Sequence, residues 1–183
     1  VPPTPENIAF FGGDLGRKRK TAQARISQMF DVLNKITVHS LIAPLAIGER
    51  DMASEHLLHL RSTDLVLLDQ GYPAFWFFKI ILSSGGQFCA RISPSVWKQV
   101  GLFHSSGNDE GFIRIKPDTV TKKKCRELGL DCDPIDIRLI RIGNEQILVD
   151  TGFGHVDGSP GTGMKRLLSE VGTTAEAIDT VVI

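Results

Sequence analysis

The chain has 183 residues, of which 42% are hydrophobic and 23% charged, a balance typical of a folded globular protein and not of a disordered or fibrous one. The 21 basic and 21 acidic residues cancel, so the net charge neither favours nor excludes a nucleic-acid partner. The most apolar stretch, residues 74–82, is interrupted by Lys79 and is much shorter than the roughly 20 residues of a membrane-spanning helix. Because the first residues show no export signal, we expect a cytoplasmic protein with no membrane partner.

The three cysteines, Cys89, Cys125 and Cys132, show no paired CxxC spacing. Neither a disulfide framework nor a zinc site is therefore favoured. We interpret all three as reduced structural thiols.

The first 20 residues are rich in proline, glycine and charge, and they contain the basic run Arg17, Lys18, Arg19 and Lys20. Such a run can contact DNA phosphates, although runs of this kind are more often a solvated surface. We expect it to lie in a loop.

Two segments, residues 24–33 and 35–45, show rough alternation of apolar and polar residues, which predicts two antiparallel strands joined near Asn34. Residues 49–60 have acidic residues first and apolar residues at helical spacing, which predicts an amphipathic helix. His56 and His59 lie three apart on this helix. That spacing can bind metal, but no third ligand is nearby, so a plain surface pair is favoured.

A short apolar strand is predicted for residues 64–68, and it ends at Asp69. Pro73 suits the first position of an apolar helix that ends before Gly85, with its aromatic residues in the core. Another strand is predicted for residues 87–92. This succession indicates an α/β fold with a mixed sheet flanked by helices.

The remainder is expected to fall into two parts. Residues 93–142 contain short alternating segments, with strands at 112–115 and 137–142 around the Lys-rich sequence TKKKC, and we interpret them as a β-rich insertion. Residues 143–183 predict a β-loop-α-β unit, with a first strand ending at Asp150 and a glycine-rich loop after it. The expected domains are therefore 1–92, 93–142 and 143–183.

Asp69 is the best candidate for chemistry, because a carboxylate at the C-terminal end of a central strand is placed to hold a divalent metal. The alternative is that Asp69 caps the helix after it. One carboxylate is not a site, since two-metal phosphoryl transfer needs several acidic oxygens around a pair of Mg²⁺ ions.

The segments AQARISQMFDVLN, KITVHSLIAPLAIGERDMASEHL, DLVLLDQGYPAFWFF and FCARIS resemble, in order and spacing, the insertion-sequence DDE transposases of the IS-four group. The resemblance covers residues 1 to about 142, since VWKQVGLFHSSG and DPIDIRLIRI are also similar to that family. It implies a ribonuclease-H-like core and metal-dependent cleavage and transfer of DNA strands at transposon ends. It also implies Mg²⁺ as cofactor and a homodimer as the full-length assembly.

By the same resemblance, DQGY matches the element around the second of three catalytic acids, which makes Asp69 that acid and a metal ligand. Arg91, in the F-x-x-R element, resembles a position near DNA. The first acid of the family would fall before Val1, and residues 143–183 contain no match to the Y-x-x-R-W-x-I-E segment of the third. We therefore expect an incomplete ribonuclease-H-like core, a fragment that is inactive alone.

The tail GNEQILVDTGFG, followed by a helix and AEAIDTVVI, resembles the opening of a metallo-β-lactamase-fold hydrolase, whose H-x-H-x-D-H zinc motif would come next. Two alternatives to a transposase fragment therefore stay open. One is a truncated hydrolase fusion, and the other is a non-enzymatic DNA-binding remnant acting through RKRK and TKKK.

Overall fold

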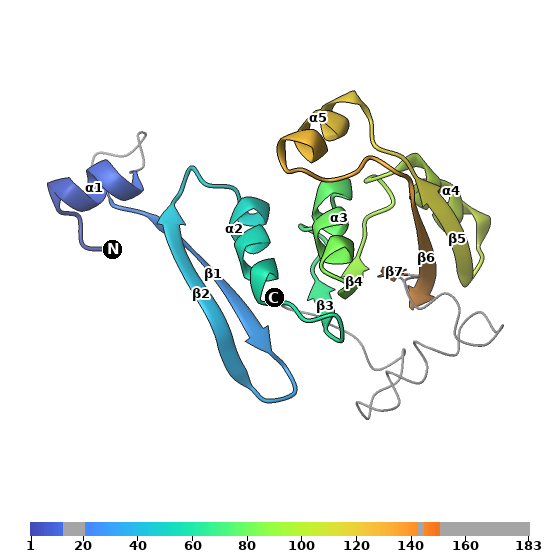
Figure 1. The fold of residues 1–183 in the computed structure, drawn as a ribbon, viewed down its shortest axis with the longest axis horizontal. Coiled ribbons are helices and arrows are strands. Elements are labelled where there is room, and N and C mark those ends of the chain that lie inside the picture. Colours follow the sequence, from blue (N-terminus) through green and yellow to red (C-terminus); the bar gives the residue numbers. More distant parts are fainter. Residues whose placement is uncertain (13–20, 143–144, 151–183) are drawn as a thin grey trace. The chain divides into compact units, whose positions relative to one another are not determined.

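The computed structural model describes residues 1–12, 21–142 and 145–150 (Figure 1). The chain divides into two compact units, the first formed by residues 1–60 and the second beginning at Arg61. The basic run at residues 17–20 and the tail at residues 151–183 lie outside the described residues.

The first unit begins with helix α1 (Pro5–Phe11), which the sequence analysis did not predict. The Thr4 side chain accepts a hydrogen bond from the Asn7 amide at 3.2 Å, and Pro5 occupies the first helical position. Both features stabilise a helix start, because they compensate for backbone amides that have no partner within the helix.

Strands β1 (Ala24–Asp31) and β2 (Ile36–Pro44) form the predicted antiparallel hairpin. The turn between them is closed by the Asp31 carboxylate, which accepts hydrogen bonds from the Leu33 and Asn34 amides at 3.0 and 2.9 Å. Such Asx-type bonds favour a turn over continued extended structure. The prediction of a junction near Asn34 is confirmed.

Alternation along the hairpin gives it two different faces. Met29 and Leu41 lie on the more buried face, and the other face carries exposed apolar side chains such as Ile26, Val38 and Ile42. Helix α2 (Glu49–His56) contacts both strands. It is shorter than predicted, because residues Leu57–His59 continue as a 3₁₀ turn, η1.

The second unit contains a five-stranded mixed sheet of order β3-β4-β7-β6-β5. Its strands are β3 (Leu65–Leu68), β4 (Gln87–Arg91), β5 (Glu110–Ile115), β6 (Ile135–Ile142) and β7 (Glu145–Asp150). Strands β3 and β4 are parallel, and the other neighbours are antiparallel. The expected α/β class and mixed sheet are therefore present.

Among its described residues this unit has three helices: α3 (Phe75–Ser83), α4 (Lys98–Ser106) and α5 (Thr119–Glu127). Helix α3 contacts β4 and α5, and α4 contacts β5. The Phe78 ring of α3 and the Phe88 ring of β4 stack at 4.0 Å between centroids and have no exposed surface. The prediction that the α3 aromatics pack in the core is confirmed for Phe75, Phe77 and Phe78, whereas Trp76 is partly exposed. Helix α3 ends as predicted before Gly85, whose φ of 75° suits glycine.

The structure differs from the expected division at residues 93 and 143. Residues 93–142 contain two helices as well as two strands, and β5 and β6 extend the sheet that begins with β3 and β4. Strand β7 lies between β4 and β6, so residues 145–150 belong to this same sheet. The difference arises because hydrogen-bonded neighbours in a sheet can be distant in sequence, which local patterns do not reveal.

No helix in the described part of the chain is both long and apolar enough to cross a membrane.

Candidate functional site

Asp69 lies directly after β3, at the C-terminal tip of that strand, as the sequence predicts. The parallel register places Leu68 opposite Ala90, so the next residues, Asp69 and Arg91, lie side by side as the two strands end. Their side chains approach to 4.0 Å between Arg91 Nη1 and Asp69 Oδ1. Both are partly accessible, with side-chain exposures of 48% for Asp69 and 25% for Arg91.

A tight turn separates Asp69 from the following helix. The Tyr72 amide donates to the Asp69 carbonyl at 3.0 Å, and the Tyr72 ring lies 6.1 Å from the Phe77 ring. The N-cap of α3 is Ala74, without a side-chain cap bond, and the helix begins at Phe75. The prediction that Pro73 is the first helical residue is therefore wrong by two positions, because the turn extends to Tyr72 and an extended Ala74 follows.

The alternative interpretation of Asp69 as a helix cap is also not what the structure shows. Asp69 precedes the N-cap of α3 by five residues, and its carboxylate pairs with Arg91 instead. An ion pair at the tips of two parallel strands holds the carboxylate at the C-terminal edge of the sheet. In open α/β sheets this edge is where ligands bind.

The described residues do not bring together enough ligands for a magnesium site. Among residues 1–12, 21–142 and 145–150, no group of three or more His, Cys, Asp or Glu side chains could hold a metal ion. Mg²⁺ prefers octahedral oxygen ligands, and the pair of ions in two-metal chemistry needs several carboxylates. The described residues therefore do not by themselves fit the expected cofactor.

The two histidines of the predicted surface pair, His56 and His59, differ in exposure. His56 is 4% exposed, whereas His59 is exposed. His56 Nδ1 lies 2.9 Å from His39 Nδ1, and His56 Nε2 lies 2.9 Å from Ser27 Oγ. Burial lowers the pKa of His56, and the neighbouring His39 and His59 lower it further. This cluster joins α2 to both strands of the hairpin.

Neither His39 nor Ser27 is among the candidate site residues predicted from the sequence. The alternation in β2 places His39 on the same face as Leu41, which is the face that contacts α2. That pattern was available in the sequence, but the contact with His56 spans 17 residues and depends on how the helix packs.

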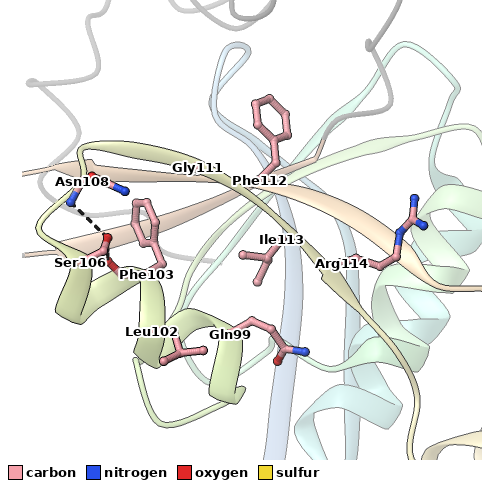
Figure 2. Close-up of a pocket in the computed structure, with 9 residues that line it drawn as sticks. All are labelled: Gln99, Leu102, Phe103, Ser106, Asn108, Gly111, Phe112, Ile113 and Arg114. Carbon is pink, nitrogen blue, oxygen red and sulfur yellow. Dashed lines mark hydrogen bonds between the residues drawn. The ribbon is translucent and has the colours of Figure 1, made fainter.

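An open hollow of about 470 Å³ lies between α4 and β5 (Figure 2), and Asp69 is not among the residues that line it. Leu102 and Phe103 line it from the helix. Its Arg114 is bound to Asp136 by two hydrogen bonds of 2.6 Å, and Ser106 donates to the Phe103 carbonyl at 2.8 Å. Because these polar groups are already engaged within the protein, the hollow presents no arrangement of acid, base and nucleophile.

The thiol of Cys89 is held in β4 and is 7% exposed. Burial raises its pKa to about 12, so the reactive thiolate form is strongly disfavoured. This agrees with its interpretation as a structural thiol.

The Lys-rich sequence TKKKC lies in helix α5, which is part of the connection between β5 and β6. The Asp118 side chain caps this helix by accepting from the Thr121 amide at 2.7 Å. Lys124 lies over the Trp76 ring at 5.0 Å, and Lys123 forms an i,i+4 pair with Glu127 at 3.9 Å. Two of the three lysines in this sequence therefore interact with other side chains of the protein.

Comparison of the chain with protein-family models, with curated proteins and with solved structures finds no match.

Proposed function

We propose that residues 1–142 form part of the catalytic core of a DDE transposase, in which Asp69 is one of the metal-binding carboxylates and Arg91 lies near DNA. In this proposal the core is ribonuclease-H-like, the partner is transposon-end DNA, and the complete enzyme acts as a homodimer with Mg²⁺. The observation that carries the proposal is the position of Asp69 beside Arg91 at the ends of two parallel strands.

Three further features support it. The hairpin, helix α2, strand β3, helix α3 and strand β4 follow one another in the order expected for the resembling segments. Asp69 is partly exposed, so a metal ion in solution can reach its carboxylate. The Arg91 side chain brings a positive charge to the same edge, where a DNA phosphate would be attracted.

The proposal assigns only one of the three catalytic acids to the 183 residues. Loss of two metal-holding carboxylates removes most of the charge stabilisation on which phosphoryl transfer depends. The chain alone should therefore leave supercoiled plasmid intact when incubated with Mg²⁺, even when the plasmid carries transposon ends.

A chimera tests the proposal with the missing acids present. Residues 24–142 would replace the matching segment of an active transposase of the IS-four group, and strand cleavage at the ends of that element would be measured. We expect Mg²⁺-dependent cleavage above the background of the same transposase with the segment deleted. A folded chimera that binds its DNA ends but never cleaves them would contradict the proposal.

The hydrolase alternative rests mainly on residues 151–183, which lie outside the described residues. Its first strand is β7, and β7 pairs with β4 and β6 of the second unit. The alternative of a non-enzymatic DNA-binding remnant depends on the run at 17–20 and on α5. It predicts salt-dependent binding with no preference for transposon ends.

A further inference from the structure

The end of helix α5 reverses the chain so that the following residues return along the helix. Gly129 has a φ of 69°, and the Leu130 amide donates to the Cys125 carbonyl at 2.9 Å. Glycine adopts this left-handed conformation readily, and the bond from Leu130 back to Cys125 is typical of a Schellman-type helix end. Residues 130–133 are therefore held close to the last turns of α5.

This reversal brings two cysteines together that lie seven residues apart in sequence. The Cys132 thiol lies 3.9 Å from the carbonyl oxygen of Lys122, which is one helical turn before Cys125. Carbonyl oxygens in a helix point toward its C-terminal end, so this contact places the Cys132 thiol beside the turn of α5 that contains Cys125. Burial raises the pKa of the Cys125 thiol, and contact with the Cys132 side chain raises it further.

The loop that carries Cys132 is attached to helix α3 through Asp131. The Asp131 carboxylate accepts a hydrogen bond from Lys79 of helix α3 and another, of 2.9 Å, from the Asp133 amide. Lys79 is 9% exposed, so this attachment lies at the junction of α3 and the loop. This bond anchors the residue before Cys132 to helix α3.

The two thiols differ in access. Cys125 has no exposed surface, whereas Cys132 is partly exposed. An oxidant in solution therefore meets Cys132 first, and Cys125 lies beside it as the second thiol. Redox-sensitive cysteines have this arrangement, in which an accessible thiol is placed next to a resolving one.

We propose that Cys125 and Cys132 form a reversible intramolecular disulfide when a hydroperoxide oxidises Cys132. The loop between them is short, and the Cys132 thiol lies against the turn of α5 that contains Cys125. This proposal is independent of the proposed transposase function, because it uses neither Asp69 nor Arg91.

The chemistry proceeds in two steps. The Cys132 thiolate attacks one oxygen of the hydroperoxide, the O–O bond breaks, and protonation of the departing oxygen gives water or an alcohol and a sulfenic acid on Cys132. The Cys125 thiol, whose raised pKa makes its thiolate a minor form and this step the slower one, then loses its proton and attacks the sulfenic sulfur; the S–O bond breaks, and the hydroxide leaves as water. Two thiols are oxidised to one disulfide, and one hydroperoxide is reduced by two electrons.

The oxidised form would tie the loop covalently to α5. Asp131 already joins this loop to Lys79 of α3, and Lys124 of α5 covers Trp76 of α3. A disulfide would therefore restrict the end of α5 against the helix that follows the Asp69 turn. Reduction by a dithiol would release it.

The test uses the whole chain, fully reduced and then freed of reductant. It is treated with an equimolar amount of hydrogen peroxide at micromolar protein concentration, alkylated under denaturing conditions and digested for mass spectrometry. We expect a cross-linked species joining Cys125 to Cys132, a loss of about 2 Da from the intact chain for the two hydrogens, and full recovery of the thiols with dithiothreitol. Cys89 should be alkylated in every sample.

Three variants show which cysteines form the cross-link. Cys89→Ser is the matched control and should form the cross-link like the parent chain. Cys132→Ser should leave Cys125 reduced under the same treatment, and Cys125→Ser should accumulate a sulfenic acid on Cys132 that dimedone traps.

The cross-link in the parent chain tests the proposal even if Cys125→Ser fails to fold, because that measurement needs no variant. Over-oxidation of Cys132 without a cross-link, a cross-link involving Cys89, or disulfides only between chains would each overturn the proposal.

Discussion

Asp69 and Arg91 end two neighbouring parallel strands, and their side chains form an ion pair of 4.0 Å at the C-terminal edge of the sheet. The pair is partly exposed, so its electrostatic contribution to stability is small, of the order of 0–1 kcal/mol. Its importance lies in position, because it places one carboxylate and one guanidinium where a ligand can reach both.

Replacing Asp69 tests the role of the carboxylate in the chimera described above. Asp69→Asn keeps the size of the side chain and removes its charge, and we expect strand cleavage to fall about 10³-fold. Binding of the DNA ends, measured by gel shift, should persist. Asp136→Asn is the matched control, because Asp136 also pairs with an arginine at a partly exposed position. If Asp69→Asn cleaves DNA as fast as Asp136→Asn does, Asp69 is not a catalytic residue.

Replacing Arg91 tests contact with DNA by the chain itself. We expect Arg91→Gln to weaken binding of a duplex and to lower the slope of log affinity against log salt by about 1, since one phosphate contact is lost. Fluorescence anisotropy at several salt concentrations measures both quantities. Arg114→Gln serves for comparison, because Arg114 is an ion-paired arginine on the outer strand β5. If both variants bind with the slope of the parent chain, Arg91 does not contact DNA.

The histidine cluster predicts a pH-dependent stability. Burial lowers the pKa of His56 below 6.5, and His39 and His59 act in the same direction against the opposing effect of Glu55. A histidine whose pKa is lower in the folded state binds its proton more readily when unfolded. The free energy of unfolding should therefore fall as pH falls below about 6.5 and stay level above it, as far as His56 is concerned.

Urea unfolding followed by circular dichroism between pH 7.5 and 5.5 measures this effect. The free energy of unfolding should depend less on pH in His56→Gln than in the parent chain. The variant His104→Gln, at an exposed position on α4, should keep the dependence of the parent chain. An NMR titration of the His56 ring with its midpoint above 6.5 would contradict the prediction, whatever the stability data show.

The stacked pair Phe78 and Phe88 predicts a large cost for truncation in the core. Both rings have no exposed surface, so Phe88→Ala should lower the free energy of unfolding by about 3–5 kcal/mol through lost burial and the cavity left behind. Phe112→Ala removes the same atoms from a residue that is 58% exposed, so it should change the free energy of unfolding by no more than about 0.5 kcal/mol. Chemical denaturation of the three proteins makes the comparison, and similar losses for the two variants would refute the assigned core.

Local patterns predicted the elements whose partners are near in sequence. The alternation on either side of Asn34 located the hairpin, and the apolar run before Asp69 located β3 and its tip. Helix α5 was missed because its sequence is polar and lysine-rich, so the apolar periodicity was weak. Its ends were marked, however, by the capping Asp118 and by Gly129, and these signals could have located it.

The long-range contacts could not be predicted in this way. Nothing near β7 in sequence indicates that it lies between β4 and β6. The meeting of His39 with His56, and of Cys125 with Cys132, depends on how a helix packs and where a chain reverses. Asp69 was found from its position after a strand, but its partner Arg91 became evident only from the parallel register.

The most direct measurement is the sequence of the genomic DNA immediately upstream of the codon for Val1. The transposase account predicts an in-frame D-G-S or D-G-T element shortly before it, which would supply the first catalytic acid. In-frame sequence that encodes no such acidic element would contradict the account and leave Asp69 as an ion-paired residue at a strand end.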